Sequence, residues 1–331
     1  MTPRARDMLR RALVLVALVL LLSPTPARSQ PSGRVQRIGV LLHDGAPPGL
    51  LETFRAGLRD LGHVEGKTVT IETRDAAGRT ERLGPLADEL VRLKVDVILA
   101  LNTPASQAAK KATATIPIVI ARTADPVHSG LVASLAHPGG NVTGLSYNNT
   151  ELGPKRIQLL REILPSVSRV AVLSNADNPG HALQIPVMER ASADLGLKLS
   201  SFTIRRPDEV PAALQSVVRA RAEALFVLDD TALTRHRAQI LRLAAAHRLP
   251  VVSRYRDFAE AGGLIAYGPS LPAVYRRTAH YVDRILKGAK PGDLPLEEPT
   301  EFDLVVNLKT AKRLGLTIPP SVLLTARSVI E

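Results

Sequence analysis

Small hydroxyl and amide side chains follow one of the continuous apolar runs of this sequence, of the kind that forms buried strands. Asn102 and Thr103 come directly after that run, and Pro104 opens an alanine-rich helical pattern that contains Ser106. We expect Thr103 to be the N-cap and Pro104 to take the first helical position, where its missing N–H costs nothing. The free N–H groups of Ala105 and Ser106 would then lie at the positive end of the helix dipole. Such a helix N-terminus predicts a binding site for a carboxylate that needs no cationic side chain. The simpler alternative is that Thr103 only caps its own helix.

Polar residues also follow two other apolar runs in the first half of the chain. Thr123 and Asp125 come after the run that ends at Ala121, and His43 and Asp44 follow the first run. Ligands of open α/β sheets bind where the carboxyl ends of strands meet, so these side chains are candidates for the same site. Asp125 precedes a proline and is equally well explained as a turn former, and His43 and Asp44 as a solvated turn.

The second half of the chain contains polar residues that could line the other side of the same binding site. Its candidates are Asn175, Asn178, Asp229, Asp230, Thr231, Tyr255 and Tyr267. One of the two adjacent aspartates could pair with a ligand ammonium while the other caps the next helix. A tyrosine combines an apolar face with one polar atom, which suits a small organic ligand. Packing at the strand ends is the alternative for each tyrosine.

Short β-type runs and amphipathic helical stretches alternate and would position these residues. The expected strands are 38–42, 69–73, 95–101, 116–121, 170–174, 199–204, 224–228, 251–253, 264–267 and 304–306. The expected helices are 50–61, 81–93, 105–113, 151–164, 185–195, 209–219, 233–247, 271–289 and a short one from Leu308. Consecutive apolar positions indicate parallel strands buried on both faces. The fold class is therefore α/β, with doubly wound parallel sheets.

The same order of elements occurs twice, at an offset of about 130 residues. RIGVLL corresponds to RVAVLS, DVILALN to ALFVLDD, and IPIVIAR to LPVVSRY. Two Rossmann-like lobes with a ligand cleft between them follow from this repeat. We divide the chain into a signal peptide (1–29), an N-terminal lobe (30–147), a C-terminal lobe (148–270) and a crossover tail (271–331). In that tail, helix 271–289 should pack on the N-terminal lobe and strand 302–307 on the C-terminal lobe, forming a multi-strand hinge.

The first residues have the pattern of a secretory signal. Four arginines precede an apolar run from Ala12 to Leu22, and a small-residue motif ends at Ser29. The run is too short to span a bilayer, which takes about 20 apolar residues. Cleavage near Ser29 would lower the formal charge from +12 to +8, because this segment holds five arginines and one aspartate. We therefore expect an exported, periplasmic protein that has no stable membrane insertion after cleavage.

The amino-acid composition and the missing motifs argue against several kinds of catalytic and metal-binding site. The sequence has no cysteine, so disulfides, thiolate zinc sites, cysteine nucleophiles and a lipid anchor on a thiol are excluded. Its eight histidines show no metal-ligand spacing. Neither a phosphate-binding glycine loop nor a nucleophile elbow occurs. We expect no metal, no cofactor, no nucleic-acid partner and no enzymatic activity, with an exported α/β hydrolase as the enzyme alternative.

Several passages resemble the TrpX-like substrate-binding proteins of ABC transporters. They are FRAGLRDLGHVEGKTVTIE, the segment 115–146 that begins TIPIVIARTADPVHSG, and the segment 262–323 that begins GGLIAYGPSLPAVYRR. The resemblance covers nearly all of the chain after residue 29 and implies the type I periplasmic binding protein fold. It also implies capture of a small solute and delivery to a permease with its ATPase subunits, by a protein expected to be a monomer.

The resemblance further implies how an amino acid would be held. Binding proteins of this type hold the carboxylate with first-lobe hydroxyls and amides, matching Thr103, Ser106 and Thr123 here. They hold the ammonium with acidic and tyrosine groups of the second lobe, matching Asp229, Asp230 and Tyr255. We infer a carboxylated or zwitterionic solute, with an amino acid, including an aromatic one, among the candidates. A periplasmic sensor that presents the same solute to a signalling receptor is the alternative function.

Overall fold

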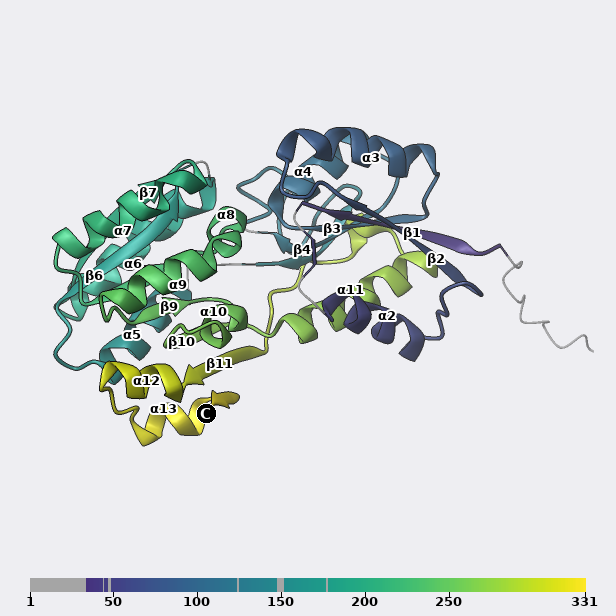
Figure 1. The fold of residues 1–331 in the computed structure, drawn as a ribbon. Helices are drawn as coiled ribbons and strands as arrows, with labels where there is room; N and C mark the ends of the chain where they lie inside the picture. The colour runs from purple at the N-terminus through teal and green to yellow at the C-terminus, as the bar shows by residue number, and fades with distance from the viewer. Residues whose placement is uncertain (1–33, 44, 47–48, 124, 148–151, 177) are drawn as a thin grey trace, which may run out of the picture. The chain divides into compact units, whose positions relative to one another are not determined.

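The computed structural model describes residues 34–331 apart from 44, 47–48, 124, 148–151 and 177 (Figure 1). The predicted signal peptide and Asp44 lie outside the described residues. Residues 36–331 form one compact unit. Among the described residues, no helix combines the length and hydropathy that a bilayer crossing requires.

The first sheet has five parallel strands in the order β2-β1-β3-β4-β5. The strands are β1 (Gln36–Leu42), β2 (Val69–Asp75), β3 (Val97–Leu101), β4 (Ile118–Thr123) and β5 (Val142–Ser146). All five residues of β3 and of β5 are buried, as expected for strands covered on both faces.

Helices cover both faces of this sheet (Figure 1). The helices are α2 (Leu50–Asp60), η1 (Thr80–Arg82), α3 (Leu83–Arg92), α4 (Thr103–Ala112) and, from the far end of the chain, α11 (Leu271–Leu286) with η3 (Pro291–Asp293). On one face Phe54 of α2 and Val274 of α11 pack with Val40. On the other face Leu90 of α3 and Ala109 of α4 pack with Ile98.

The second sheet has seven strands in the order β12-β11-β10-β9-β8-β6-β7. They are β6 (Arg169–Asn175), β7 (Lys198–Ile204), β8 (Ala224–Val227), β9 (Val251–Ser253), β10 (Ile265–Pro269), β11 (Phe302–Asn307) and β12 (Ser328–Ile330). The β10–β11 pair is antiparallel and the other pairs are parallel.

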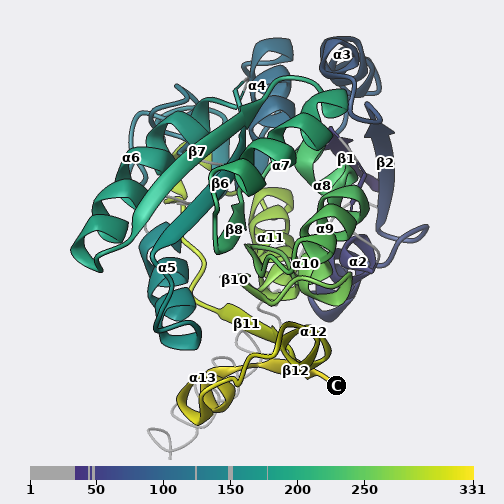
Figure 2. The ribbon, with the colours of Figure 1, turned by 60° about the vertical axis from the view of Figure 1, so that its left-hand side comes forward.

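Two groups of helices cover the second sheet, and Figure 2 shows α6 and α7 on opposite sides of β6 and β7. One group is α5 (Leu152–Ile163), α6 (Pro179–Asp194), α12 (Leu308–Leu314) and α13 (Pro320–Thr325). The other is η2 (Pro207–Glu209), α7 (Val210–Arg219), α8 (Thr231–Arg235), α9 (Arg237–Ala246) and α10 (Arg256–Glu260). The chain passes from β5 to α5, from β10 to α11, and from η3 to β11, so three connections join the two sheets.

The structure confirms the fold class and corrects several elements. Residues 142–146 were expected in a connecting segment because of their Gly and Asn/Thr content, but they form β5. Strand β12 and helices α10 and α13 were not predicted. The helix expected over 233–247 is split at His236 into α8 and α9, and α6 begins at Pro179 instead of Ile185. The boundaries proposed for the two lobes stay a prediction.

Candidate functional site

The N-terminus of α4 differs from the sequence prediction. Asn102, not Thr103, is the N-cap, and its side-chain oxygen accepts a hydrogen bond from Ala105 N. The Ser106 N–H donates to the Asn102 carbonyl at 3.0 Å. Both predicted free amides are therefore engaged inside the turn, and the expectation that they await an anion is wrong. Thr103 begins the helix and is partly exposed.

Ser106, in the helix that follows β3, and Thr123, at the end of the neighbouring strand β4, lie together as expected. Their hydroxyl groups, however, form a hydrogen bond with each other. Their hydroxyl oxygens are 2.9 Å apart, and Ser106 also donates to the Asn102 carbonyl at 2.7 Å. Both side chains are fully buried. These hydrogen bonds hold the first turn of α4 against the end of β4.

Removing both of these hydroxyls should destabilise the fold by less than the sum of the two single removals. We expect Ser106→Ala to lower the free energy of unfolding by about 1–3 kcal/mol, since it leaves the buried Thr123 hydroxyl with one partner fewer. The Ser106→Ala/Thr123→Val double variant should lose less than the sum of the single losses. Urea unfolding of the four proteins measures this coupling, and strictly additive losses would contradict it.

Arg122 lies at the end of β4, on a β-bulge. The β4–β5 register shifts between Ile120 and Thr123, and Arg122 has φ 57°. Its Nη2 donates to the Tyr255 hydroxyl at 2.9 Å, which joins the end of β4 to the end of β9. The buried Nε of Arg122 has no acceptor among the described residues. A β-bulge redirects the side chains of its strand, and here the bulge carries Arg122, which reaches Tyr255.

Arg254 lies at the corresponding place after β9 and is almost completely buried. Its Nη1 donates to the Asp229 carboxylate at 2.7 Å. Its guanidinium carbon lies 3.6 Å from the centre of the Tyr147 ring, a close cation–π contact. Tyr147 follows β5, so Arg254 joins the carboxyl ends of strands from both sheets.

A third arginine, the buried Arg156, comes from α5. Its Nε donates to the Tyr267 carbonyl at 2.8 Å, while its buried Nη2 finds no acceptor in the described part of the chain. The Tyr267 ring itself stacks on Phe302, with ring centres 6.0 Å apart. Tyr267 therefore contributes its backbone, and its ring packs against β11. We call Arg122, Arg156, Arg254, Asp229, Tyr147 and Tyr255 the arginine–tyrosine cluster.

Electrostatics set the charge state of the cluster. Burial raises the pKa of the Asp229 carboxyl, but Arg254 and then Arg122 lower it, so that it lies below its usual value. Burial, followed by the like charge of Arg254, lowers the pKa of Arg156 to about 9. Burial raises the pKa of Tyr147 and Tyr255, against the opposing effect of the arginines. Near neutral pH the cluster therefore holds three guanidinium cations and one carboxylate.

The two adjacent aspartates have separate partners. Asp229 pairs with Arg254, whereas Asp230 accepts from the side-chain amides of Asn175 at 3.2 Å and Asn178 at 3.0 Å. Asp230 also accepts from Leu233 N and so caps α8. Asp229 thus belongs to the cluster, and Asp230 belongs to a local network with both asparagines. Thr231 begins α8, and its side chain lies outside the described part.

His181 connects the main chain at the ends of β6 and β8. The buried His181 Nδ1 accepts from Asn175 N at 3.0 Å, which leaves Nε2–H to donate to the Asp229 carbonyl at 3.0 Å. The main chain at Asp229 is therefore fixed independently of its carboxylate.

The remaining sequence candidates lie in turns. Asp125 is exposed and accepts from His128 N at 2.9 Å, which is the turn-forming role left open as its alternative. His43 is buried, and its Nε2 lies 2.9 Å from the Thr80 hydroxyl.

Three non-glycine residues with positive φ lie where strands of the first sheet end. Asn102, Arg122 and Asp125 have φ values of 85°, 57° and 36°. Such conformations cost a non-glycine residue about 1–3 kcal/mol each and persist where the surrounding structure enforces them, commonly at functional sites. The strain therefore marks the same sheet edge as the cluster does.

Sequence reasoning missed all three arginines and Tyr147. The signal was present, because Arg122 is the last residue of the passage IPIVIAR and Arg254 is the penultimate residue of its repeat LPVVSRY. The two arginines are one position out of register in that alignment, and the extra residue of the β4 bulge accounts for the offset.

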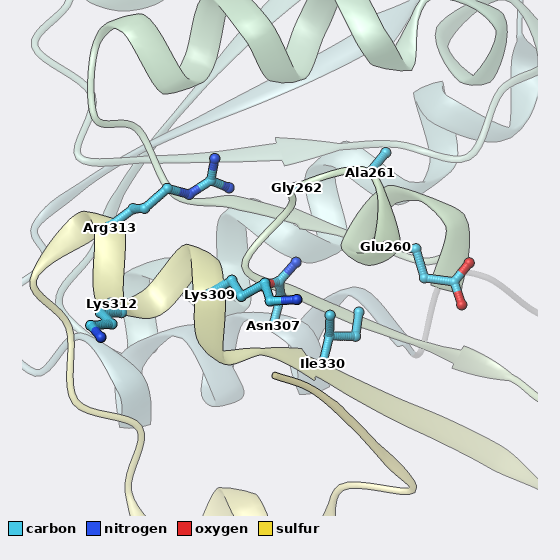
Figure 3. A pocket seen from close by; sticks show the side chains of 8 residues that line it. All are labelled: Glu260, Ala261, Gly262, Asn307, Lys309, Lys312, Arg313 and Ile330. Carbon is cyan, nitrogen blue, oxygen red and sulfur yellow. The ribbon is translucent and has the colours of Figure 1, made fainter.

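An open pocket of about 620 Å³ lies elsewhere, between the end of α10 and the β11–α12 connection (Figure 3). Figure 3 shows Lys309 and Asn307 near its centre, with Lys312 pointing away from them. Asn307 is committed to capping α12 through Thr310 N. No residue of the arginine–tyrosine cluster lines this pocket.

Comparisons with known proteins show the family and the fold of the chain. Residues 39–330 match the family model described as ABC transporter substrate binding protein. A tyrosine-binding protein of Clostridioides difficile (strain R20291) is 26% identical over 264 residues, which cover 80% of this chain and 75% of the relative. The chain also has the fold of solved type I periplasmic binding proteins.

Two solved structures are especially similar. A Streptococcus pneumoniae ABC domain in complex with L-Trp has a TM-score of 0.83 at 26% identity, with 90% of this chain and 100% of that chain covered. A ligand-free, open substrate-binding protein with adhesive properties from Clostridium difficile has a TM-score of 0.71 at 26% identity, with coverage of 89% and 99%.

Proposed function

The chain belongs to the ABC transporter substrate-binding proteins, and from that premise we propose that it captures a small carboxylated solute at the arginine–tyrosine cluster for delivery to a membrane permease. The observation that carries this proposal is the pair Arg122 and Arg254, which join the strand ends of the two sheets through Tyr255 and Tyr147. Guanidinium groups bind carboxylates with charge-assisted hydrogen bonds, and tyrosine rings suit an organic body.

The relatives favour an aromatic amino acid or a close analogue as the solute. The relative from Clostridioides difficile is a tyrosine-binding protein, and the Streptococcus pneumoniae domain was solved in complex with L-Trp. In this chain the guanidinium carbon of Arg122 lies 5.2 Å from the centre of the Tyr255 ring, and that of Arg254 lies 3.6 Å from the centre of the Tyr147 ring. Aromatic rings beside cations suit a flat ligand that carries a carboxylate.

The proposed mechanism is closure of two lobes on the solute. Contacts that come from both sheets exist together only when the sheets approach, so ligand binding selects the closed state. The ligand-free relative described as open supports this step. Transport also requires export, for which we propose cleavage near Ser29, and a permease that binds the closed form and is driven by ATPase subunits.

A thermal-shift panel tests the function. The chain without residues 1–29 is mixed with L-tyrosine, L-tryptophan, aromatic carboxylates, and neutral sugars and nucleosides as controls. We expect carboxylated solutes to stabilise it, by about 2.7 kcal/mol at a hundredfold excess over Kd. Small-angle scattering should then show a smaller radius of gyration at saturation. Stabilisation by the neutral solutes alone, or an unchanged radius, would contradict the proposal.

A further inference from the structure

The arginine–tyrosine cluster carries more positive charge than its own residues neutralise. Asp229 is engaged by Arg254 at 2.7 Å. The other nearby carboxylate, Asp257, lies 3.7 Å from Arg237, a cation outside the cluster. Arg122 and Arg156 therefore have no carboxylate of their own among the described residues, and the cluster has a formal excess of two positive charges.

The hydrogen-bonding groups show the same imbalance. Arg122 Nε and Arg156 Nη2 are buried donors with no acceptor, and the buried Tyr147 hydroxyl has no partner among the described residues. Native proteins satisfy nearly all such groups, and buried cations are paired, so these donors point to a missing acceptor that carries negative charge. The lowered pKa of Arg156 agrees, because burial and Arg254 oppose its charge and no anion offsets them fully.

We infer that the solute is a net anion, a carboxylate without an α-ammonium group, and that the site prefers it to the amino acid of the same shape. This inference rests on the proposed function and narrows its substrate class. An amino acid adds no net charge and brings an ammonium that needs an acceptor. Asp229 is already paired, so such an ammonium would have to reach the buried Asp257 Oδ1, which has no partner in the described chain.

Matched ligand pairs that differ only in the ammonium group test the inference. The probes are L-tyrosine against 3-(4-hydroxyphenyl)propionate, and L-tryptophan against indole-3-propionate, titrated calorimetrically at pH 7 into the chain without residues 1–29. We expect the propionate of at least one pair to bind ten times more tightly than its amino acid or better. The loss of the ammonium removes a repulsion and leaves the carboxylate contacts intact.

Two variants separate the charge from the shape of the site. Arg156→Met should weaken propionate binding at least tenfold, yet leave the ligand-free melting temperature unchanged or higher, because it removes an uncompensated buried cation. Arg156→Lys keeps the charge and should lose less affinity than Arg156→Met. A merely structural arginine would show the opposite result, a lower melting temperature and unchanged affinity.

The outcomes distinguish this inference from the proposed function. Tighter binding of both amino acids than of both propionates, with Asp257→Asn weakening only the amino acids, would overturn the inference and leave solute capture standing. Absence of binding by all four probes, together with no response to the wider carboxylate panel, would overturn both.

Discussion

Replacing Asp229 by asparagine lowers the free energy of unfolding by about 3 kcal/mol at pH 7, because the change leaves the buried Arg254 without its counter-charge. Arg254 has a side-chain exposure of 1%, so water cannot replace the lost carboxylate. Denaturant unfolding measured by circular dichroism provides the value. The matched control is Asp208→Asn, whose partner Arg206 is 68% exposed, and which should change stability by about 0.5 kcal/mol or less.

The pH dependence of this difference has a definite sign. The pKa of Asp229 is lower in the folded protein than in the unfolded chain, so the folded state holds the proton more weakly. The stabilisation is therefore complete above the unfolded pKa of about 4 and is lost as the pH falls through the lower, folded pKa. The gap between wild type and Asp229→Asn should be constant from pH 7 to pH 5 and should narrow below pH 4. A gap that widens on acidification would show that Asp229 is not the ionised partner.

Replacing Gly144 by alanine should lower the free energy of unfolding by about 3 kcal/mol or more. Gly144 has φ 127°, and an added Cβ would overlap the Ile120 carbonyl oxygen and come within 2.7 Å of Ile120 N. These are backbone atoms of the adjacent strand, so relief requires that β4 and β5 separate. The separation would disturb the bulge that positions Arg122, and solute affinity should fall together with stability.

Gly140→Ala is the control for Gly144→Ala. Gly140 precedes β5, is exposed, and has no atom within 4 Å of an added Cβ. We expect it to leave both stability and affinity unchanged within error. Equal effects of the two substitutions would mean that the close approach of β5 to β4 does not position the site.

The order of strands and helices could be predicted because it is local. Consecutive apolar residues, as in Val97–Leu101, indicate a strand buried on both faces, and each helical stretch repeats its apolar positions on one side. Strand β5 could not be predicted in this way, since its central glycine argues against a strand. Only the approach to Ile120 explains why glycine is required there.

The arginine–tyrosine cluster lies at the sheet edge where the sequence predicts a site, but most of its residues differ from the predicted ones. Thr123, Asp229 and Tyr255 follow strands, and the topology of a parallel sheet brings such residues together whatever their partners are. Which groups remain available depends on contacts between residues far apart in sequence. Ser106 is satisfied by Thr123, and Asp229 by Arg254. Neither pairing leaves a periodic trace in the sequence.

The sequence by itself determined the α/β class, the duplicated order of elements and the strand ends at which polar residues gather, because short-range periodicity and chain topology fix these. Only the tertiary structure decided that the candidate cluster is cationic. Burial makes an arginine's charge costly unless it is paired, and whether Arg156 and Arg254 are buried beside Arg122 depends on the β4 bulge and on contacts between the two sheets.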